Sequence, residues 1–245
     1  KTEAVRMVPT GVKGDCKWNG IAYGEVKLFC APFNSPDVLV IDAKTEAVRM
    51  VPTGVEAKKK TVRWNGIAYG EGKFFCVPDD SPDVLVIDAK TEAVRMVPTG
   101  VKGDCKWNGI AYGEVKLFCA PFNSPDVLVI DAKTEAVRMV PTGVEGGCKW
   151  RGIAYGDGKL FCAPMNSPDV LVIDAKTEAV RMVPTGVESP VGGVPSCWSG
   201  IAYCEGKLFC APLSTEDVLV IDDLPGQLFA LTGHRGGDRA PMKAR

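Results

Sequence analysis

The sequence predicts an all-β protein built from repeated four-stranded units, and three observations carry this prediction. The stretch Lys-Thr-Glu-Ala-Val-Arg-Met-Val-Pro-Thr-Gly-Val occurs five times without change, beginning at Lys1, Lys44, Lys90, Lys133 and Lys176. Successive copies begin 43 or 46 residues apart, a period typical of stacked supersecondary units. Each repeat holds four short apolar runs and no ten-residue stretch with the apolar spacing of a helix. Four strands at this period are typical of a β-propeller blade.

Each unit is expected to contain four strands in the order A, B, C, D. In the first complete unit they are residues 18–23, 27–31, 38–42 and 46–51. The Gly-rich link Gly24-Glu25-Val26 predicts a hairpin between A and B. Strands B and C lack polar alternation, as expected of strands covered on both faces. Strand D carries the charges Glu46 and Arg49, as expected of an outer strand.

The predicted fold is therefore all-β: a five-bladed β-propeller of four-stranded antiparallel blades over residues 1–223. Residues 224–245 are expected to form a C-terminal tail that is partly disordered. The chain opens with a lone D strand at residues 3–8, and its last unit ends with strand C. We expect the N-terminal strand to complete the last blade and close the ring, because closure removes exposed sheet edges. The alternative is that residues 227–231, a degenerate D-like segment, complete that blade, which leaves the first strand over from a longer array.

Composition limits the partners. Hydrophobic residues make up 46% of the chain, charged residues 24%, and the formal net charge is -1, so no basic excess favours nucleic acid. The longest apolar runs, such as Val38-Leu39-Val40-Ile41, are far below the roughly 20 residues that cross a membrane. We therefore expect neither nucleic-acid binding nor membrane insertion.

Five of the ten cysteines occupy the same place in successive units: Cys30, Cys76, Cys119, Cys162 and Cys210. Equivalent positions of stacked sheets lie roughly 10 Å apart, whereas a disulfide needs Cα atoms within about 7 Å. We expect these side chains to be buried and reduced, which favours an intracellular compartment. The only histidine is His234 and no C-x-x-C pair occurs, so no metal and no cofactor is expected.

Residues 27–69 resemble the YVTN-type β-propeller repeat. The match is best at Val38-Leu39-Val40-Ile41-Asp42, with Thr45 and Val48, and it recurs in all five units. The chain departs from that pattern at the Cys-Ala-Pro that ends strand B and at the Trp that precedes strand A. The resemblance implies the fold. Propellers of this kind serve as surface, scaffold and sometimes enzyme domains, so no catalytic residue is carried over.

The D–A loops differ in length and charge while the strands hardly vary, and in a propeller they share one face with the B–C loops. Binding residues concentrate on loops over a rigid scaffold. We therefore expect a non-enzymatic scaffold that binds a protein partner through this face. Its candidate residues are Lys58, Lys59, Lys60, Arg63, Lys17, Lys106 and Lys149. Sequence motifs of hydrolases, metalloproteases and nucleotide-binding enzymes are absent.

Two other functions remain open. A multivalent carbohydrate binder would use one aromatic platform per blade, with neighbouring amides for sugar hydroxyls; the residues are Trp18, Trp64, Trp107, Trp150, Trp198, Asn19, Asn65 and Asn108. The competing interpretation is that each Trp packs between blades. A lactonase- or lyase-like enzyme is the third reading. It would hold a metal at the centre of the ring. The carboxylates that end strand C, such as Asp42 and Asp88, are candidates for metal or acid/base chemistry and are otherwise expected to cap turns.

Overall fold

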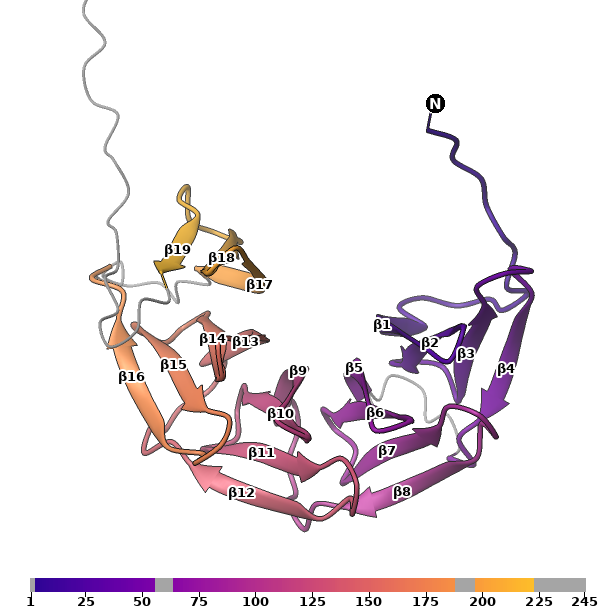
Figure 1. Cartoon of the computed structure of the whole chain (residues 1–245), viewed down its shortest axis with the longest axis horizontal. Helices are drawn as coiled ribbons and strands as arrows, with labels where there is room; N and C mark the ends of the chain where they lie inside the picture. Colours follow the sequence, from indigo (N-terminus) through magenta and orange to yellow (C-terminus); the bar gives the residue numbers. More distant parts are fainter. Residues whose placement is uncertain (1–2, 56–63, 188–196, 223–245) are drawn as a thin grey trace, which may run out of the picture.

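The computed structural model describes residues 3–55, 64–187 and 197–222, which form nineteen strands in five antiparallel sheets. The sheets follow one another along an open arc, and each forms one blade (Figure 1). We number the blades 1 to 5 in chain order. No helix able to span a membrane occurs in the described part of the chain. The predicted all-β architecture of repeated blades is confirmed.

The strands of each blade follow the predicted order. Strand A is β1 (Trp18–Gly24), β5 (Trp64–Gly70), β9 (Trp107–Gly113), β13 (Trp150–Gly156) and β17 (Trp198–Cys204). Strand B is β2 (Lys27–Pro32), β6 (Lys73–Pro78), β10 (Lys116–Pro121), β14 (Lys159–Pro164) and β18 (Lys207–Pro212). Strand C is β3 (Asp37–Asp42), β7 (Asp83–Asp88), β11 (Asp126–Asp131), β15 (Asp169–Asp174) and β19 (Leu219–Asp222). Strand D is β4 (Val48–Pro52), β8 (Val94–Pro98), β12 (Val137–Pro141) and β16 (Val180–Pro184).

Two turns shape each blade. Glu25 and Val26 of the first A–B hairpin have φ of 51° and 63°, as a type I′ turn requires. Strand D begins two residues later than expected, at Val48. The reason is that Glu46 has φ 62° and donates its N–H to the Asp42 carbonyl at 2.8 Å, so it belongs to the C–D turn.

The A strands line the inside of the arc and approach one another closely (Figure 1). A Cβ atom on Gly109 would lie 2.9 Å from the Cα atom of Gly152 in the next blade, and Gly109 has φ 89°. Glycine is required here by both the contact and the conformation. This position in each blade therefore permits the tight inner radius.

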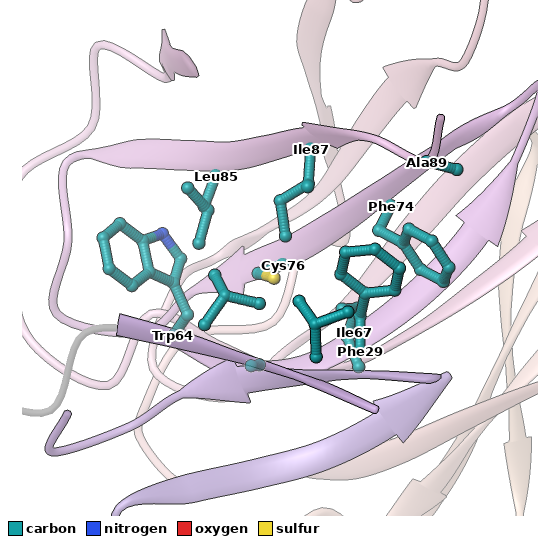
Figure 2. Close-up of a cluster of buried hydrophobic side chains, with 11 residues drawn as sticks. Phe29, Trp64, Ile67, Phe74, Cys76, Leu85, Ile87 and Ala89 are labelled. Atoms are coloured by element: carbon teal, nitrogen blue, oxygen red, sulfur yellow. The ribbon is translucent and has the colours of Figure 1, made fainter. Parts of the chain in front are cut away.

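The core lies between blades, where one face of each sheet packs on the next. Figure 2 shows the first such cluster, in which Phe29 of blade 1 meets Trp64, Phe74 and Leu85 of blade 2. The rings of Phe29 and Phe74 stack at 4.2 Å between centroids. Three further clusters repeat this pattern along the arc. Each blade is therefore stabilised by its neighbours, as in other repeat proteins.

Four of the five equivalent cysteines, Cys76, Cys119, Cys162 and Cys210, lie in these clusters, and Cys30 is buried in blade 1. All ten cysteines are free thiols. Burial raises the pKa of the Cys30 thiol to about 11 and raises the pKa of Cys76 further. Buried thiols of this kind are small apolar side chains rather than reactive groups.

The structure does not show the expected ring closure. The fifth sheet has three strands, β17-β18-β19, and the two ends of the arc lie apart (Figure 1). Residues 3–8 form no strand, and Val5 and Met7 are 94% and 90% exposed. The alternative closing segment, residues 227–231, lies outside the described residues, as does the tail.

Candidate functional site

The D–A and B–C loops are hydrogen-bonded to one another, and we call the surface that they form the loop face. The Lys106 N–H, in the D–A loop before β9, donates to the Asp79 carbonyl of blade 2 at 3.1 Å. The Lys106 carbonyl accepts from the Phe122 N–H of blade 3 at 3.0 Å. Lys149 repeats both bonds one blade further on. Each of these D–A loops therefore joins the B–C loops of two adjacent blades.

Lys106 and Lys149 hold these loops together and do not offer their charges to a partner. Both residues are 3% exposed. The Nζ atom of Lys106 donates to the carbonyl oxygens of Asp79, Ser81 and Gly103 at 2.7, 3.0 and 2.9 Å. Burial lowers the pKa of both lysines, and nearby carboxylates oppose this shift. These two members of the expected partner surface are thus buried and stabilise the contacts between loops.

The other predicted members of that surface fall into two groups. Lys17 is half-buried, and its Nζ atom donates to the Val12 carbonyl at 3.0 Å. The remaining four lie outside the described residues: Lys58, Lys59, Lys60 and Arg63.

A carboxylate pair on the loop face was missed by the sequence analysis. Asp79 is 5% exposed and accepts a hydrogen bond from Asn65 Nδ2 at 3.3 Å. Burial raises the pKa of Asp79 to about 6. Asp80 accepts the Cys105 N–H at 2.9 Å. The available signal was that Asp79-Asp80 replaces the Phe-Asn of blades 1 and 3.

Asp79, Asp80 and Cys105 bring their ligating atoms within 4.8 Å of one another, the one such group found among the described residues. The contacts are structural. In blade 3 the side chain of Asn123 accepts the Cys148 N–H at 2.9 Å, the same bond that Asp80 makes in blade 2. Asp80 therefore takes the place of an amide that supports the loop.

The loop face is hollowed beside blade 1. A recess of about 410 Å³ lies between its D–A and B–C loops, with Lys13, Asp15 and Asn34 exposed at the rim. The same residue types recur in blade 3 as Lys102, Asp104 and Asn123. The described loop face thus presents alternating charges rather than a single-signed patch.

The tryptophans do not form ligand platforms. The rings of Trp64, Trp107, Trp150 and Trp198 are at most 2% exposed and pack between blades. Their Nε1 atoms donate to backbone carbonyls at 2.8–2.9 Å, as Trp107 does to Asp126. Trp18 is half-buried, and no other blade packs on it in the part of the chain that the structure describes. For the four buried rings the packing interpretation is therefore correct, and their faces are closed to a ligand.

The amides beside these rings are also engaged. Asn19 Nδ2 donates to Asn65 Oδ1 at 2.8 Å, while Asn108 is half-buried. Two of the three amides proposed for sugar hydroxyls, Asn19 and Asn65, are therefore bonded to each other.

The aspartates that end strand C cap turns, as expected. Asp42 Oδ1 accepts the N–H groups of Lys44 and Thr45 at 2.9 and 2.8 Å, and these bonds lower the pKa of Asp42, with Thr45 the larger cause. Three arginines of strand D bind glutamates of the following blade: Arg49 binds Glu92, Arg95 binds Glu135 and Arg138 binds Glu178. These charges stabilise contacts between blades.

Comparison with known proteins identifies the architecture. No family model matches the chain, and no curated protein matches it in sequence. Among solved structures, virginiamycin B lyase from Staphylococcus aureus superimposes with a TM-score of 0.70 at 14% identity, covering 89% of this chain and 70% of that one. The chain has a β-propeller fold. The YVTN-type label is not matched by any family model.

Two further neighbours are propellers of a different kind. The WD40 repeats of RRP9 match with a TM-score of 0.63 at 13% identity, over 87% of this chain and 64% of that one. A chain of the nidogen/laminin complex matches with a TM-score of 0.59 at 11% identity, over 87% and 80%. At these identities the likeness establishes the fold alone, and the propeller does not by itself assign an activity.

Proposed function

We propose that the chain is a non-enzymatic scaffold that binds a protein partner through its loop face. The observation that carries this proposal is where the units differ. Their strands are nearly invariant, whereas the described B–C loops read Phe33-Asn34, Asp79-Asp80, Phe122-Asn123, Met165-Asn166 and Leu213-Ser214. Variation over a fixed framework is the usual arrangement of a recognition surface.

The geometry of the loops supports this reading. Buried Lys106 and Lys149 hold successive loops in register, so the exposed side chains around them are presented on a stiff frame. Lys13 and Asp15, and their counterparts Lys102 and Asp104, give two equally composed charge pairs two blades apart. One structural neighbour is a chain of the nidogen/laminin complex, an assembly of two proteins, and this is consistent with the proposal.

The experiment is affinity capture with three versions of the full chain, followed by quantitative mass spectrometry. The loop variant carries Lys13→Glu, Asp15→Lys, Lys102→Glu and Asp104→Lys, which leaves the net charge unchanged. The control variant carries Lys44→Glu and Lys90→Glu, in the C–D turns at the opposite ends of the strands.

We expect a protein that the wild type and the control retain but the loop variant loses. Direct binding of that purified protein should weaken by at least about tenfold for the loop variant, because charges on an interface rim steer and orient association. Equal retention by all three versions, or loss with the control alone, would refute binding through the loop face.

A further inference from the structure

Residues 1–56 and 90–145 are identical, so blades 1 and 3 should bury the same side chains if their surroundings were the same. They do not. Trp107 and Leu117 of blade 3 are 0% exposed, whereas their counterparts Trp18 and Leu28 are only half-buried, and Ile21 is 56% exposed. The difference is that, among the described residues, no blade packs against this face of blade 1. Blade 1 therefore presents a complete but unoccupied blade-binding face.

The other end of the arc presents the complementary face. In blade 4, Phe161 and Val170 are 0% and 2% exposed because blade 5 covers them. The same positions in blade 5 are Phe209 and Val218, which are 41% and 54% exposed. Every internal cluster joins the same positions of two blades, a Phe-Ala-Val-Val face and the Trp-Leu-Cys-Leu-Ile face of the next blade. Blade 2 has Val77 in place of the Ala and Phe74 in place of the first Leu. The two ends of the chain carry the two halves of a fifth such cluster.

Charged groups at the two ends match in the same way. Between inner blades, one glutamate binds a lysine and an arginine of the preceding blade, as Glu135 binds Lys73 at 2.6 Å and Arg95. Glu46 is the counterpart in blade 1; its side chain is 41% exposed, and the basic group bound to it among the described residues is Arg6. Lys207 of blade 5, the counterpart of Lys73, is 52% exposed and directed to its own Asp222.

The backbone completes the match. Residues 5–9 have the sequence of β4, and β19 has the sequence of the last four residues of β3. Strands β3 and β4 pair with Leu39 opposite Met50 and Ile41 opposite Val48. The same register would place Leu219 opposite Met7. The Arg6–Glu46 contact already holds residues 5–9 on the outer side of blade 1, where the D strand of a preceding blade would lie.

We propose that a second copy of this chain occupies the free face, so that blade 5 of one copy stacks head-to-tail on blade 1 of the next. Residues 5–9 of the second copy then supply the fourth strand of that blade, and Lys207 reaches Glu46 of the second copy. The contact is heterologous, so it propagates into open chains or larger rings. A single copy does not make it, because its two ends lie apart (Figure 1).

One residue weakens this contact. Inner blades place a glycine of strand A against a tyrosine of the next blade, and a Cβ atom on Gly156 would lie 2.4 Å from Tyr203 Cδ2. Blade 5 has Cys204 in this position. Tyr23 is 61% exposed and must rotate to admit the Cys204 side chain. Replacing Cys204 by glycine should therefore strengthen the association.

The first test is sedimentation velocity of the full chain across a wide range of concentrations. We expect masses that rise above 26.2 kDa in whole multiples. Phe209→Asp and Ile21→Asp should each weaken association by about 100-fold or more, because a charge would enter the centre of the interface. Val115→Asp, on an exposed hairpin position far from either end face, is the control and should associate as the wild type does.

Mixing the two end variants separates this arrangement from others. The Ile21→Asp chain keeps a sound blade 5, and the Phe209→Asp chain keeps a sound blade 1. Each alone should be monomeric, and the mixture should form one-to-one dimers of twice the chain mass and nothing larger. A symmetric contact between two blade 1 faces, or between two blade 5 faces, would instead leave one variant able to dimerise alone and would overturn the proposal.

Two further variants test its details. Cys204→Gly should tighten the association by about tenfold, and deletion of residues 1–9 should weaken it by a similar factor. A wild-type chain that stays monomeric at every concentration overturns the proposal, as does a Cys204→Gly chain that associates no more strongly than the wild type. Unchanged association after the deletion would refute the added strand.

Discussion

The packing between blades can be tested with two phenylalanines in equivalent positions. Phe118 in β10 is 0% exposed and packs against blade 4, whereas Phe209 in β18 is 41% exposed. A buried phenylalanine removes roughly 200 Å² from water, and at about 25 cal/mol per Å² this contributes about 5 kcal/mol. Phe118→Ala should therefore cost about 3–5 kcal/mol, the usual range for such cavities. Phe209→Ala should cost about 1–2 kcal/mol, since much of the ring already contacts water.

The assay is urea unfolding at dilute protein concentration, followed by tryptophan fluorescence and by hydrogen exchange of β10 and β18. Repeat proteins need not unfold in one step, so the midpoint and the exchange protection of each blade are compared rather than one global free energy. We expect Phe118→Ala to lower the midpoint and to reduce protection in blades 3 and 4 together. Equal effects of the two substitutions would refute the conclusion that each blade is stabilised mainly by the blade that covers it.

The remaining predictions use the same matched positions. Lys106→Met should destabilise the fold by about 3 kcal/mol in thermal or urea unfolding, because three carbonyl oxygens lose a charged donor. Lys17→Met removes the one carbonyl contact found for that lysine, so it should cost less than about 1 kcal/mol in the same assay. Glu135→Gln should lower the free energy of unfolding by about 1–3 kcal/mol at neutral pH, and Glu46→Gln by less than about 1 kcal/mol. Because Arg95 lowers the pKa of Glu135, the difference between Glu135→Gln and the wild type should fade as the pH drops below about 4. A pH-independent difference would contradict the ion pair. The folded-state pKa of Asp79, about 6, lies above its unfolded value, so the stability of the wild type should fall as the pH rises from about 4 to about 6. Asp79→Asn should be more stable than the wild type by about 1–3 kcal/mol at pH 8 and similar to it below about pH 4. Asp104→Asn, at an exposed position, should change stability little at either pH.

Much of the fold could be predicted because the repeats show both the period of the unit and its pattern of apolar residues. Five identical D-strand segments fix the period, and the doubly apolar strands B and C show that each sheet is covered on both faces. The start of strand D was misplaced by two residues. Glu46 looks like a strand residue in an alternating pattern, and only the structure reveals its positive φ. Local propensity does not mark that position, since glutamate rarely adopts this conformation.

The candidate site was predicted less well, for a physical reason. Lys106 and Lys149 were assigned to the partner surface because they lie in the variable D–A loops. Here three carbonyl oxygens converge on the ammonium group of Lys106, and the indole ring of Trp107 lies 5.7 Å from it, which together replace its hydration. That convergence depends on two neighbouring blades and leaves no local pattern. Asp79 is different: its departure from the repeated Phe-Asn was visible, but its burial was not.

Ring closure could not be read from the repeat at all, and the reason follows from the interface. Every contact between blades is specified by residues of two adjacent units, so the sequence states which face binds which. It does not state whether the neighbour belongs to the same chain. That depends on the angle between successive blades, which the close approach of Gly109 to Gly152 helps to set. With four such steps between five blades the arc stays open (Figure 1). The free Trp18 face and the free Phe209 face are thus the two ends of an interface that the chain already forms four times within itself.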